Sequence, residues 1–492
     1  MKDVDSRALA FLVDQAFIRV MESSHPHSGR RTFLTASAAT LSTPILADAA
    51  LASDTADGPG RPIRPQRPGR ELRALLREID PRRIEADILR MVAFGTRHTL
   101  STQTDPVRGI GAAVEWVHAR LQAVAAASGG RMTVEKQSFV QPVSPRVPAP
   151  TTITNVVATL RGDASPARLY VVTGHLDSRA SDVMNATADA PGADDDASGV
   201  AVVLELARLF ATRRTRGTLV FAVVSGEEQG LYGSAHLAAK LKEAGADVQA
   251  MFSNDIVGAG SGWDGTRPEP HTVRLFVEGV PTTETPQEAA LRQSVGGEND
   301  GPSRQLGRFV KDVAENDATG MKVRVIWRRD RYLRGSDHIS FIRQGYPAAR
   351  FTEPRENYAH EHQDVRVENG VQYGDLPEFV DFDYTARVAK VNAATLWSLA
   401  QGPGTPKNVT IDAATLTNDT TLHWDRDPDP GIAGYEVIWR ETTSPDWTHA
   451  IDVGDVTTAT IDLAKDNVQF ALRATTPDGH RSPAAFPRAT TT

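Results

Sequence analysis

LYVVTGHLD, residues 169–177, begins as a continuous apolar run and ends on a histidine and an aspartate. Further along, PGADDDASGVAVVLELARLF (191–210) places three aspartates before a segment that is apolar nearly all round, as a buried helix is. LVFAVVSGEEQG (219–230) is a second apolar run and ends on two glutamates. Apolar strands separated by helices are typical of parallel sheets covered on both faces. The sequence therefore predicts an α/β fold with a mostly parallel mixed sheet and helices on both faces.

Outward from this centre, the same alternation continues in both directions. Asp80-Pro81 and Asp105-Pro106 each predict the start of a helix, because aspartate caps helix N-termini and proline suits the first helical position. Further helices are predicted around residues 306–313 and 379–400. The remaining strands are predicted at residues 251–257, 273–277, 323–327 and 347–351. We expect this α/β domain to span residues 72–402.

The N-terminal residues 1–52 have the pattern of a secretory signal peptide. Arg30 and Arg31 precede a mildly apolar stretch, and Ala50-Leu51-Ala52 is a small-residue cleavage site. The paired arginines resemble the twin-arginine export type, which predicts a periplasmic or extracellular protein. Residues 53–71 alternate prolines with arginines and predict a stiff, exposed linker.

After residue 402 the pattern changes to short segments with a period of two, separated by turn signals at residues 428–431 and 477–479. Residues 403–492 therefore predict a small all-β sandwich. Trp424, Tyr435 and the run 470–474 resemble landmarks of a fibronectin type III module. An exposed aromatic such as Trp447 could contact a polysaccharide or a protein, although packing or plain surface is the simpler interpretation.

Composition excludes several classes of function. The chain has 492 residues and no cysteine, which excludes disulfides, thiolate nucleophiles and cysteine-held metals. Its formal net charge of -8 argues against a nucleic-acid partner. No apolar run approaches the roughly 18–20 residues that span a bilayer, so we expect no membrane span. Any metal must be held by His, Asp and Glu.

Acidic and imidazole side chains gather at four places, each at the end of a predicted strand or before a predicted helix. These are His175 with Asp177, Asp194 to Asp196, Glu227 with Glu228, and Asp255. In open α/β sheets, sites form outside the carboxyl ends of the strands, and His with carboxylates suits a zinc-type centre. Asp177 is placed to accept a hydrogen bond from the ring of His175, as carboxylates near zinc-bound histidines often do. One alternative is a calcium loop, because Asp194, Asp196, Ser198, Gly199 and Glu205 match its spacing. Another is that Asp194 only caps the following helix.

Together these residues resemble the co-catalytic di-zinc aminopeptidase family, typified by secreted bacterial leucyl aminopeptidases. The motifs GHLD, PGADDDASGVAVVLE, SGEEQGLYGS, SDHISF, GYPAA and NYAHEHQD occur in the family's order across residues 72–402. The resemblance implies a zinc exopeptidase fold, two zinc ions, and a peptide substrate with a free N-terminus. It implies metal ligands at His175, Asp195 as the bridge, Glu228, Asp255 and His360. It also implies that Glu227 is the general base and that Asp177 orients His175.

Some positions depart from the family pattern. His360-Glu361-His362 offers two histidines where one is typical, and His360 is preferred because it lies four residues before Asp364. Tyr358 is the candidate for stabilising the oxyanion, with Tyr332 as an alternative. Relatives of this scaffold also include glutamate carboxypeptidase-type peptidases and glutaminyl cyclases, and non-catalytic binding proteins that lack the metal residues. The first two remain alternatives for this chain. A non-catalytic binding protein is a less favoured one, because all five ligand positions and the base are present.

Overall fold

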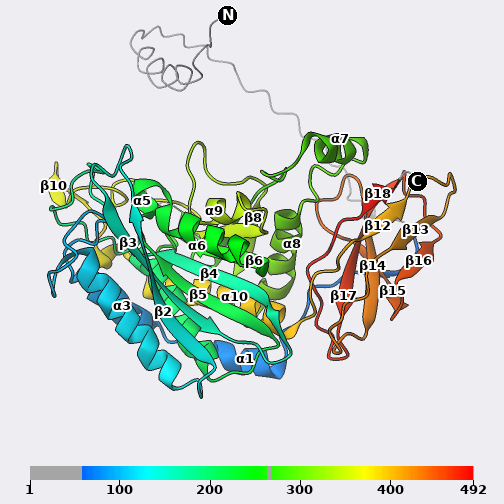
Figure 1. Cartoon of the computed structure of the whole chain (residues 1–492), viewed down its shortest axis with the longest axis horizontal. Helices are drawn as coiled ribbons and strands as arrows, with labels where there is room; N and C mark the ends of the chain where they lie inside the picture. The colour runs from blue at the N-terminus through cyan, green and yellow to red at the C-terminus, as the bar shows by residue number, and fades with distance from the viewer. Residues whose placement is uncertain (1–57, 263–266, 491–492) are drawn as a thin grey trace, which may run out of the picture. The chain divides into compact units, whose positions relative to one another are not determined.

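The computed structural model describes residues 58–262 and 267–490. The predicted signal peptide, residues 1–52, lies outside them. An eight-stranded sheet forms the centre of the catalytic domain, with strand order β2-β3-β5-β4-β6-β9-β7-β8 (Figure 1). Its strands are β2 (Met132–Gln141), β3 (Thr151–Leu160), β4 (Ser165–His175), β5 (Gly217–Val224), β6 (Asp247–Asn254), β7 (Thr272–Val277), β8 (Lys322–Ile326) and β9 (Ala348–Thr352).

The middle of this sheet is parallel, as predicted. Strand β4 pairs in parallel with β5 and β6, and β6 pairs in parallel with β9. Strands β2, β3 and β7 introduce the antiparallel pairings that make the sheet mixed. Strands β2 and β3 were not predicted, because β2 is partly exposed and polar residues interrupt the apolar run of β3.

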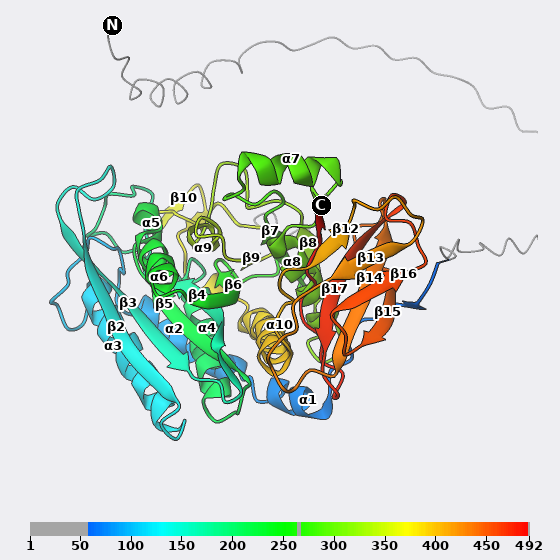
Figure 2. The ribbon, with the colours of Figure 1, turned by 45° about the vertical axis from the view of Figure 1, so that its right-hand side comes forward.

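Helices cover both faces of the sheet, which confirms the predicted fold class (Figures 1 and 2). One face packs against α2, α3, α4, α8 and α10, and the other against α6 and α9. Along β4, Tyr170 and Val172 point to the first group and Val171 to the second, which is the two-residue period of a strand. The helices are α1 (Arg70–Leu76), α2 (Pro81–Val92), α3 (Gly109–Ala126), α4 (Ala197–Ala211), α5 (Glu227–Gly230), α6 (Tyr232–Glu243), α7 (Pro286–Ser294), α8 (Pro302–Ala314), α9 (His338–Ile342) and α10 (Phe382–Gln401).

The two Asp-Pro signals behave differently. The Asp80 side chain accepts a hydrogen bond from the backbone N–H of Arg82 and caps α2, as predicted. Asp105 instead accepts from the backbone N–H groups of Val107 and Arg108 in a turn. Helix α3 therefore begins at Gly109, three residues later than the signal suggests.

Two four-stranded sheets follow the catalytic domain, in the orders β1-β15-β14-β17 and β16-β13-β12-β18. They enclose a core that includes Trp424, Tyr435 and Leu472, which agrees with a β-sandwich. The strands are β1 (Arg61–Pro62), β12 (Thr410–Asp412), β13 (Thr420–His423), β14 (Gly434–Glu441), β15 (His449–Gly454), β16 (Thr458–Ile461), β17 (Val468–Thr475) and β18 (Arg488–Thr490). Strand β1 belongs to the segment predicted as a linker, and it pairs with β15. That pairing was not anticipated.

The sandwich is joined to α8 by buried polar contacts. Arg440 forms a 2.7 Å ion pair with Asp300, which also pairs with Arg308. The indole N–H of Trp447 donates to Gln305 over 2.9 Å. Trp447 is therefore a packing residue at this contact, which agrees with the simpler of the two interpretations of the sequence. A polysaccharide or protein partner of the sandwich stays a hypothesis.

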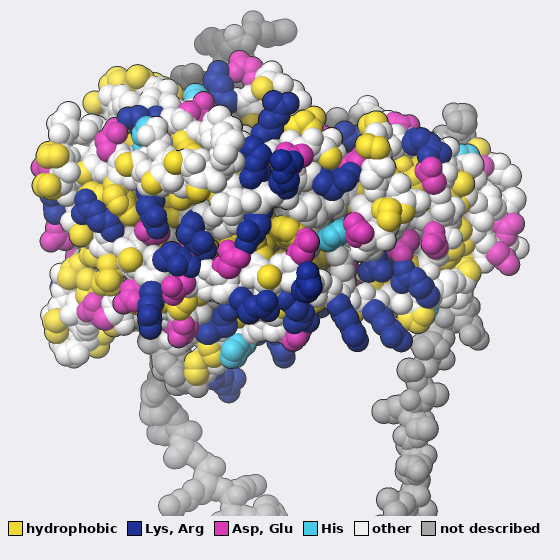
Figure 3. Space-filling model, turned by 90° about the horizontal axis from the view of Figure 1, so that it is seen from below, with side chains coloured by type: hydrophobic (Ala, Val, Ile, Leu, Met, Phe, Trp, Pro, Cys, Tyr) yellow, Lys and Arg dark blue, Asp and Glu magenta, His cyan; other side chains and the backbone are white. Residues whose placement is uncertain are grey.

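The surface and the helices bear on two expectations. On the face in Figure 3, acidic side chains lie among the numerous Lys and Arg side chains. The expectation of no nucleic-acid partner rests on the net charge and stays a prediction. Among the residues that the structure describes, no helix combines the length and the apolar character needed to cross a membrane.

Candidate metal centre

The candidate site lies where three neighbouring parallel strands end. Strand β4 ends at His175, β6 ends one residue before Asp255, and β5 is followed by a turn into α5 with Glu227 and Glu228. Gly226 makes that turn with a φ of 80°, a backbone conformation that glycine adopts without strain. The carboxyl ends of adjacent parallel strands meet at one edge, so side chains distant in the sequence converge there.

Asp195 lies at the middle of this convergence. Its Oδ1 is 3.1 Å from Nε2 of His175, and its Oδ2 is 2.9 Å from Nε2 of His362. Nε2 of His175 is also 4.0 Å from Asp255 Oδ1, and Nε2 of His362 is 3.0 Å from Glu228 Oε1. The donor atoms thus form two adjacent groups that share one carboxylate. This is the arrangement required of a residue that bridges two cations.

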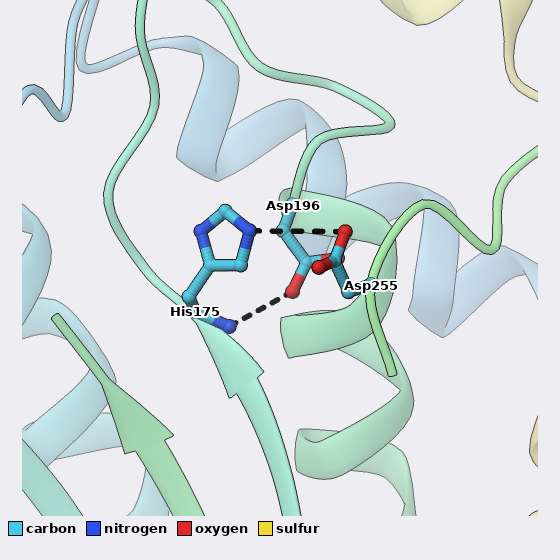
Figure 4. A group of neighbouring side chains, drawn as sticks. All are labelled: His175, Asp196 and Asp255. Carbon is cyan, nitrogen blue, oxygen red and sulfur yellow. Dashed lines mark hydrogen bonds and ion pairs between the residues drawn. The ribbon is translucent and has the colours of Figure 1, made fainter. Parts of the chain in front are cut away.

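Asp196 is close to His175 and Asp255 but has a different role (Figure 4). Its Oδ2 accepts the backbone N–H of His175 at 2.8 Å, and its Oδ1 accepts that of Gly199 at 3.0 Å. Because both oxygens are engaged by backbone amides, Asp196 anchors the end of β4 and caps α4. By distance alone Asp196 groups with His175 and Asp255. The oxygens of Asp195, however, face imidazole nitrogens instead of backbone amides, so Asp195 is the better candidate ligand.

The structure brings His362, and not the preferred His360, to the cluster. The ring of His360 stacks on Phe379 with centroids 3.5 Å apart, and burial lowers its pKa. His362 has a φ of 53°, and from that backbone position its ring reaches Asp195 and Glu228. The four-residue spacing to Asp364 therefore selected the wrong histidine.

Asp177 also acts differently from the expectation. Nδ1 of His175 lies 3.0 Å from the backbone carbonyl oxygen of Asp177 and 3.8 Å from its carboxylate. The carboxylate instead accepts the backbone N–H groups of Gly226, Glu227 and Glu228. A carbonyl oxygen only accepts, so Nδ1 carries a proton. In the metal-free chain Nε2 also donates to Asp195, and loss of that Nε2 proton would free its lone pair for a metal. Asp177 orients His175 through its backbone and fixes the turn of the two glutamates through its side chain.

The calcium-loop alternative does not fit the structure. Ser198, Gly199 and Glu205 belong to α4, and the carboxylate of Glu205 pairs with Arg208 and Arg83. A calcium loop would fold these positions around one ion. The three aspartates therefore precede an ordinary helix.

Comparisons with known proteins identify the family. A model described as Peptidase family M28 matches residues 155–369. A Pyrenophora tritici-repentis protein named "Probable zinc metalloprotease" is 51% identical over 90% of this chain and 93% of its own length. The chain belongs to peptidase family M28. It is a zinc metallopeptidase, and it acts on peptides.

Solved structures also match this M28 peptidase at low sequence identity. The Legionella pneumophila LapA aminopeptidase is 20% identical, with a TM-score of 0.45 over 66% of this chain and 73% of its own. A Porphyromonas gingivalis glutaminyl cyclase is 17% identical, with a TM-score of 0.45 over 65% of this chain and 98% of its own.

The side chains at the centre of this M28 peptidase fit zinc. Imidazole nitrogens and carboxylate oxygens are zinc ligands in proteins without cysteine at the site. The Oε1 atom of Glu228 is buried without an aligned hydrogen-bond partner among the described residues, so a donor atom is left for a cation. His175, Asp195 and Asp255 would hold one ion, and Asp195, Glu228 and His362 a second.

The protonation states of His362 and Asp195 reflect how closely the carboxylates and imidazoles of the centre are packed. Burial by itself lowers the pKa of His362, but Glu228 and Asp195 outweigh it and raise that pKa to about 11. Burial raises the pKa of Asp195, yet hydrogen bonds with His175 and His362 hold it well below its ordinary value. The metal-free cluster thus keeps protons on the histidines, and a metal must displace them.

Glu227 is the candidate base beside this cluster. Its side chain is partly buried, and its backbone N–H is held by Asp177. Burial raises its pKa well above the usual carboxyl value; His175 opposes this shift and the charges of Asp255 and Glu228 add to it. A carboxyl group with a raised pKa beside a metal centre is suited to accept and release a proton.

The two tyrosines lie at the surface. The side chain of Tyr358 is 59% exposed and that of Tyr332 is 79% exposed. The Tyr332 hydroxyl accepts a hydrogen bond from Arg328. Within the described residues no hydrogen bond joins either hydroxyl to the cluster, and the oxyanion role of Tyr358 stays a prediction.

Two residues of the site were missed. The fully buried Arg350 of β9 donates to Asp255 Oδ1 at 3.0 Å and to Asp330 at 3.1 Å. Asp375 accepts the backbone N–H groups of Asp194 and Asp195 at 2.8 and 2.7 Å. Arg350 could have been noticed as the charged residue of an apolar strand. Asp375 lies in an irregular loop, where no pattern marks it.

Proposed function

We propose that this M28 peptidase is an exported aminopeptidase that holds two zinc ions and removes N-terminal residues from peptides. The observation that carries the proposal is the position of Asp195, whose two oxygens face two different histidines. A single ion would need only one of the two groups of donor atoms, the one with His175 or the one with His362. When bound, a zinc pair polarises the scissile carbonyl group and lowers the pKa of the attacking water.

The residues of the chain supply the remaining steps. Glu227 takes the proton of the attacking water and delivers it to the departing amine. Asp177 keeps Glu227 in place by holding the backbone of its turn. The carboxylates of the metal centre favour a positively charged group, so the free α-amine of the substrate binds there and restricts cleavage to the N-terminus.

The first test combines metal analysis with substrate choice. Purified chain lacking residues 1–52 is expected to contain close to two zinc ions and to hydrolyse aminoacyl-arylamides but not their N-acetylated forms. Cleavage of the blocked forms would favour a carboxypeptidase-type activity. Conversion of N-terminal glutamine to pyroglutamate would favour a glutaminyl cyclase.

The second test concerns the base. Glu227→Gln keeps the shape of the side chain and removes its charge, so both zinc ions should stay while kcat falls by about 100- to 10,000-fold. Glu243→Gln, an exposed change on α6, is the matched control and should leave kcat unchanged. Normal turnover of the Glu227 variant would remove Glu227 from this role.

Export is proposed from the N-terminal residues alone. Arg30 and Arg31 followed by an apolar stretch and Ala50-Leu51-Ala52 support it. Replacing both arginines by lysine should keep the protein inside a bacterial host that has twin-arginine export. Unchanged export of that variant would contradict the twin-arginine type.

A further inference from the structure

A cavity of about 230 Å³ opens beside the metal centre, on the side of Asp195 that faces the loops after β9. Six of its lining residues are acidic, and none of the described ones is Lys or Arg: Asp194, Asp195, Glu353, Glu361, Asp375 and Glu378. By comparison, a dry protein cavity of about 150 Å³ binds benzene. The cavity is therefore large enough for a long side chain and has the charge to attract a cation.

Most of these carboxylates already have partners inside the protein. Asp375 accepts two backbone N–H groups, and Glu353 accepts the backbone N–H of Ala259 at 3.0 Å. Asp194 accepts the backbone N–H of Gly258. These contacts fix the walls of the cavity and leave few oxygens for a further ligand.

Glu361 is different. It is 8% exposed, and its Oε1 pairs with Arg334 while its buried Oε2 has no hydrogen-bond partner in the described chain. A buried carboxylate oxygen without a donor is costly unless a ligand satisfies it. Glu361 is a lining residue of this cavity, so the wall includes a carboxylate with one oxygen that finds no donor among the residues described.

The rest of the lining is mixed, with the polar side chains of Ser261 and Asn357 beside apolar surface. Ile256 and Ala259 contribute aliphatic surface, and the stacked rings of His360 and Phe379 form another wall near the mouth. Apolar surface beside acidic groups suits a side chain with a methylene stem and a charged end. A small inorganic cation would use only the acidic part.

The cavity is also joined to the metal centre by the chain itself. Asp195 faces both, and Glu361 directly precedes His362, whose ring faces Asp195 and Glu228. A peptide whose N-terminal residue is held at the metal centre would therefore direct the side chain of that residue into this space.

We propose that this cavity is the subsite for the side chain of the substrate's N-terminal residue and that it selects lysine and arginine. The inference rests on the proposed aminopeptidase function and names its substrate class. The unpartnered oxygen of Glu361 accepts from the ammonium or guanidinium group, and Glu378 at the exposed mouth attracts it. Calcium is a poorer occupant, because it needs 6–8 oxygen ligands and most of the oxygens here are engaged.

The experiment compares side chains that differ only in charge. The zinc-loaded protein is assayed with the 4-nitroanilides of lysine, arginine, leucine and norleucine; norleucine has an unbranched four-carbon side chain like that of lysine but no amine. We expect kcat/KM for lysine to exceed that for norleucine by about 10- to 100-fold, the range of a hydrogen bond to a charged group.

Two variants locate the preference. Glu361→Gln should lower the lysine-to-norleucine ratio by about 10-fold, while zinc content and norleucine turnover stay within about threefold. Glu378→Gln changes an exposed residue that cannot disturb the core, and it should lower the same ratio by a smaller factor. Glu368→Gln, on the exposed hairpin strand β10 (Arg366–Glu368), is the matched control and should leave the ratio unchanged.

The outcomes separate this inference from the proposed function. The basic subsite would be overturned if the leucine substrate were cleaved as well as the lysine substrate and if the lysine-to-norleucine ratio stayed the same in Glu361→Gln and Glu378→Gln. That result would leave the proposed aminopeptidase function intact. No cleavage of any unblocked substrate would overturn both. One calcium ion per chain that is lost in Glu361→Gln, without a change in the ratio, would show a structural cation site and overturn the inference.

Discussion

The choice between His360 and His362 gives the sharpest test of the metal centre. Only His362 faces Asp195 and Glu228, with Nε2 2.9 and 3.0 Å from their oxygens. His360 stacks on Phe379 outside the cluster. Replacing each histidine by alanine therefore separates a metal ligand from a packing residue two positions away. Each variant is the control for the other.

The magnitude follows from the number of ligands. A complete structural zinc site is worth about 10–16 kcal/mol, so one of about four ligands contributes about 3 kcal/mol. Loss of this ligand should therefore raise the dissociation constant for zinc by about 100-fold. For His360, loss of the stacked contact should cost about 1 kcal/mol of folding stability. His360→Ala should therefore lower Tm slightly and leave the zinc affinity unchanged.

The assay is zinc content after equilibration with a zinc buffer, followed by turnover of an unblocked arylamide. His362→Ala should retain close to one zinc ion and lose most of its activity, whereas His360→Ala should retain two and remain active. The reverse pattern would refute the placement of the histidines. Equal loss in both variants would refute the assignment of His360 to packing.

Three further predictions follow from the same contacts. In the metal-free chain burial lowers the pKa of His362, but the neighbouring carboxylates outweigh burial and raise this pKa to about 11. The stabilisation that its positive charge gives to the folded state is therefore fully present below about pH 6.5. It is lost as the pH rises through about 11. Zinc binding near pH 8 should thus release this proton, which calorimetry in two buffers of different ionisation enthalpy detects; no buffer dependence would contradict it. Asp177→Asn should cost about 1–3 kcal/mol and lower kcat with little loss of zinc, because the turn of Glu227 loses acceptors; unchanged kcat would contradict this. Arg440→Met should cost about 3 kcal/mol by leaving Asp300 less well paired, measured by urea unfolding with kcat as the control, and unchanged stability would refute it.

The fold could be predicted because the central strands are buried on both faces. Continuous apolar runs such as those of β4 and β5 identify parallel strands without knowledge of their neighbours. Strand β2, at the edge of the sheet, could not be identified this way because it is partly exposed. Strand β3 is mostly buried, but threonines and the buried Asn155 interrupt its apolar run. The pairing of β1 with β15 joins residues almost four hundred positions apart, and no local pattern encodes it.

The site was predictable where ligands follow strands and unpredictable where they sit in loops. His175, Asp255 and the glutamates follow strand ends, and the topology brings them together. His362 lies in an irregular loop with a positive φ, which is uncommon outside glycine and has no signature in the sequence. Spacing counted along such a loop cannot show which of two nearby histidines turns inward.

The three consecutive aspartates show why composition at a site is a poor guide to its chemistry. Asp194 accepts the backbone N–H of Gly258 and lines the acidic cavity. Asp195 keeps both oxygens for the two histidines, and Asp196 gives both of its oxygens to backbone amides. Identical side chains thus serve three purposes: one lines the cavity, one faces the two histidines, and one supports the backbone. The division is set by which backbone N–H groups surround each carboxylate, and the fold, rather than the motif, determines that.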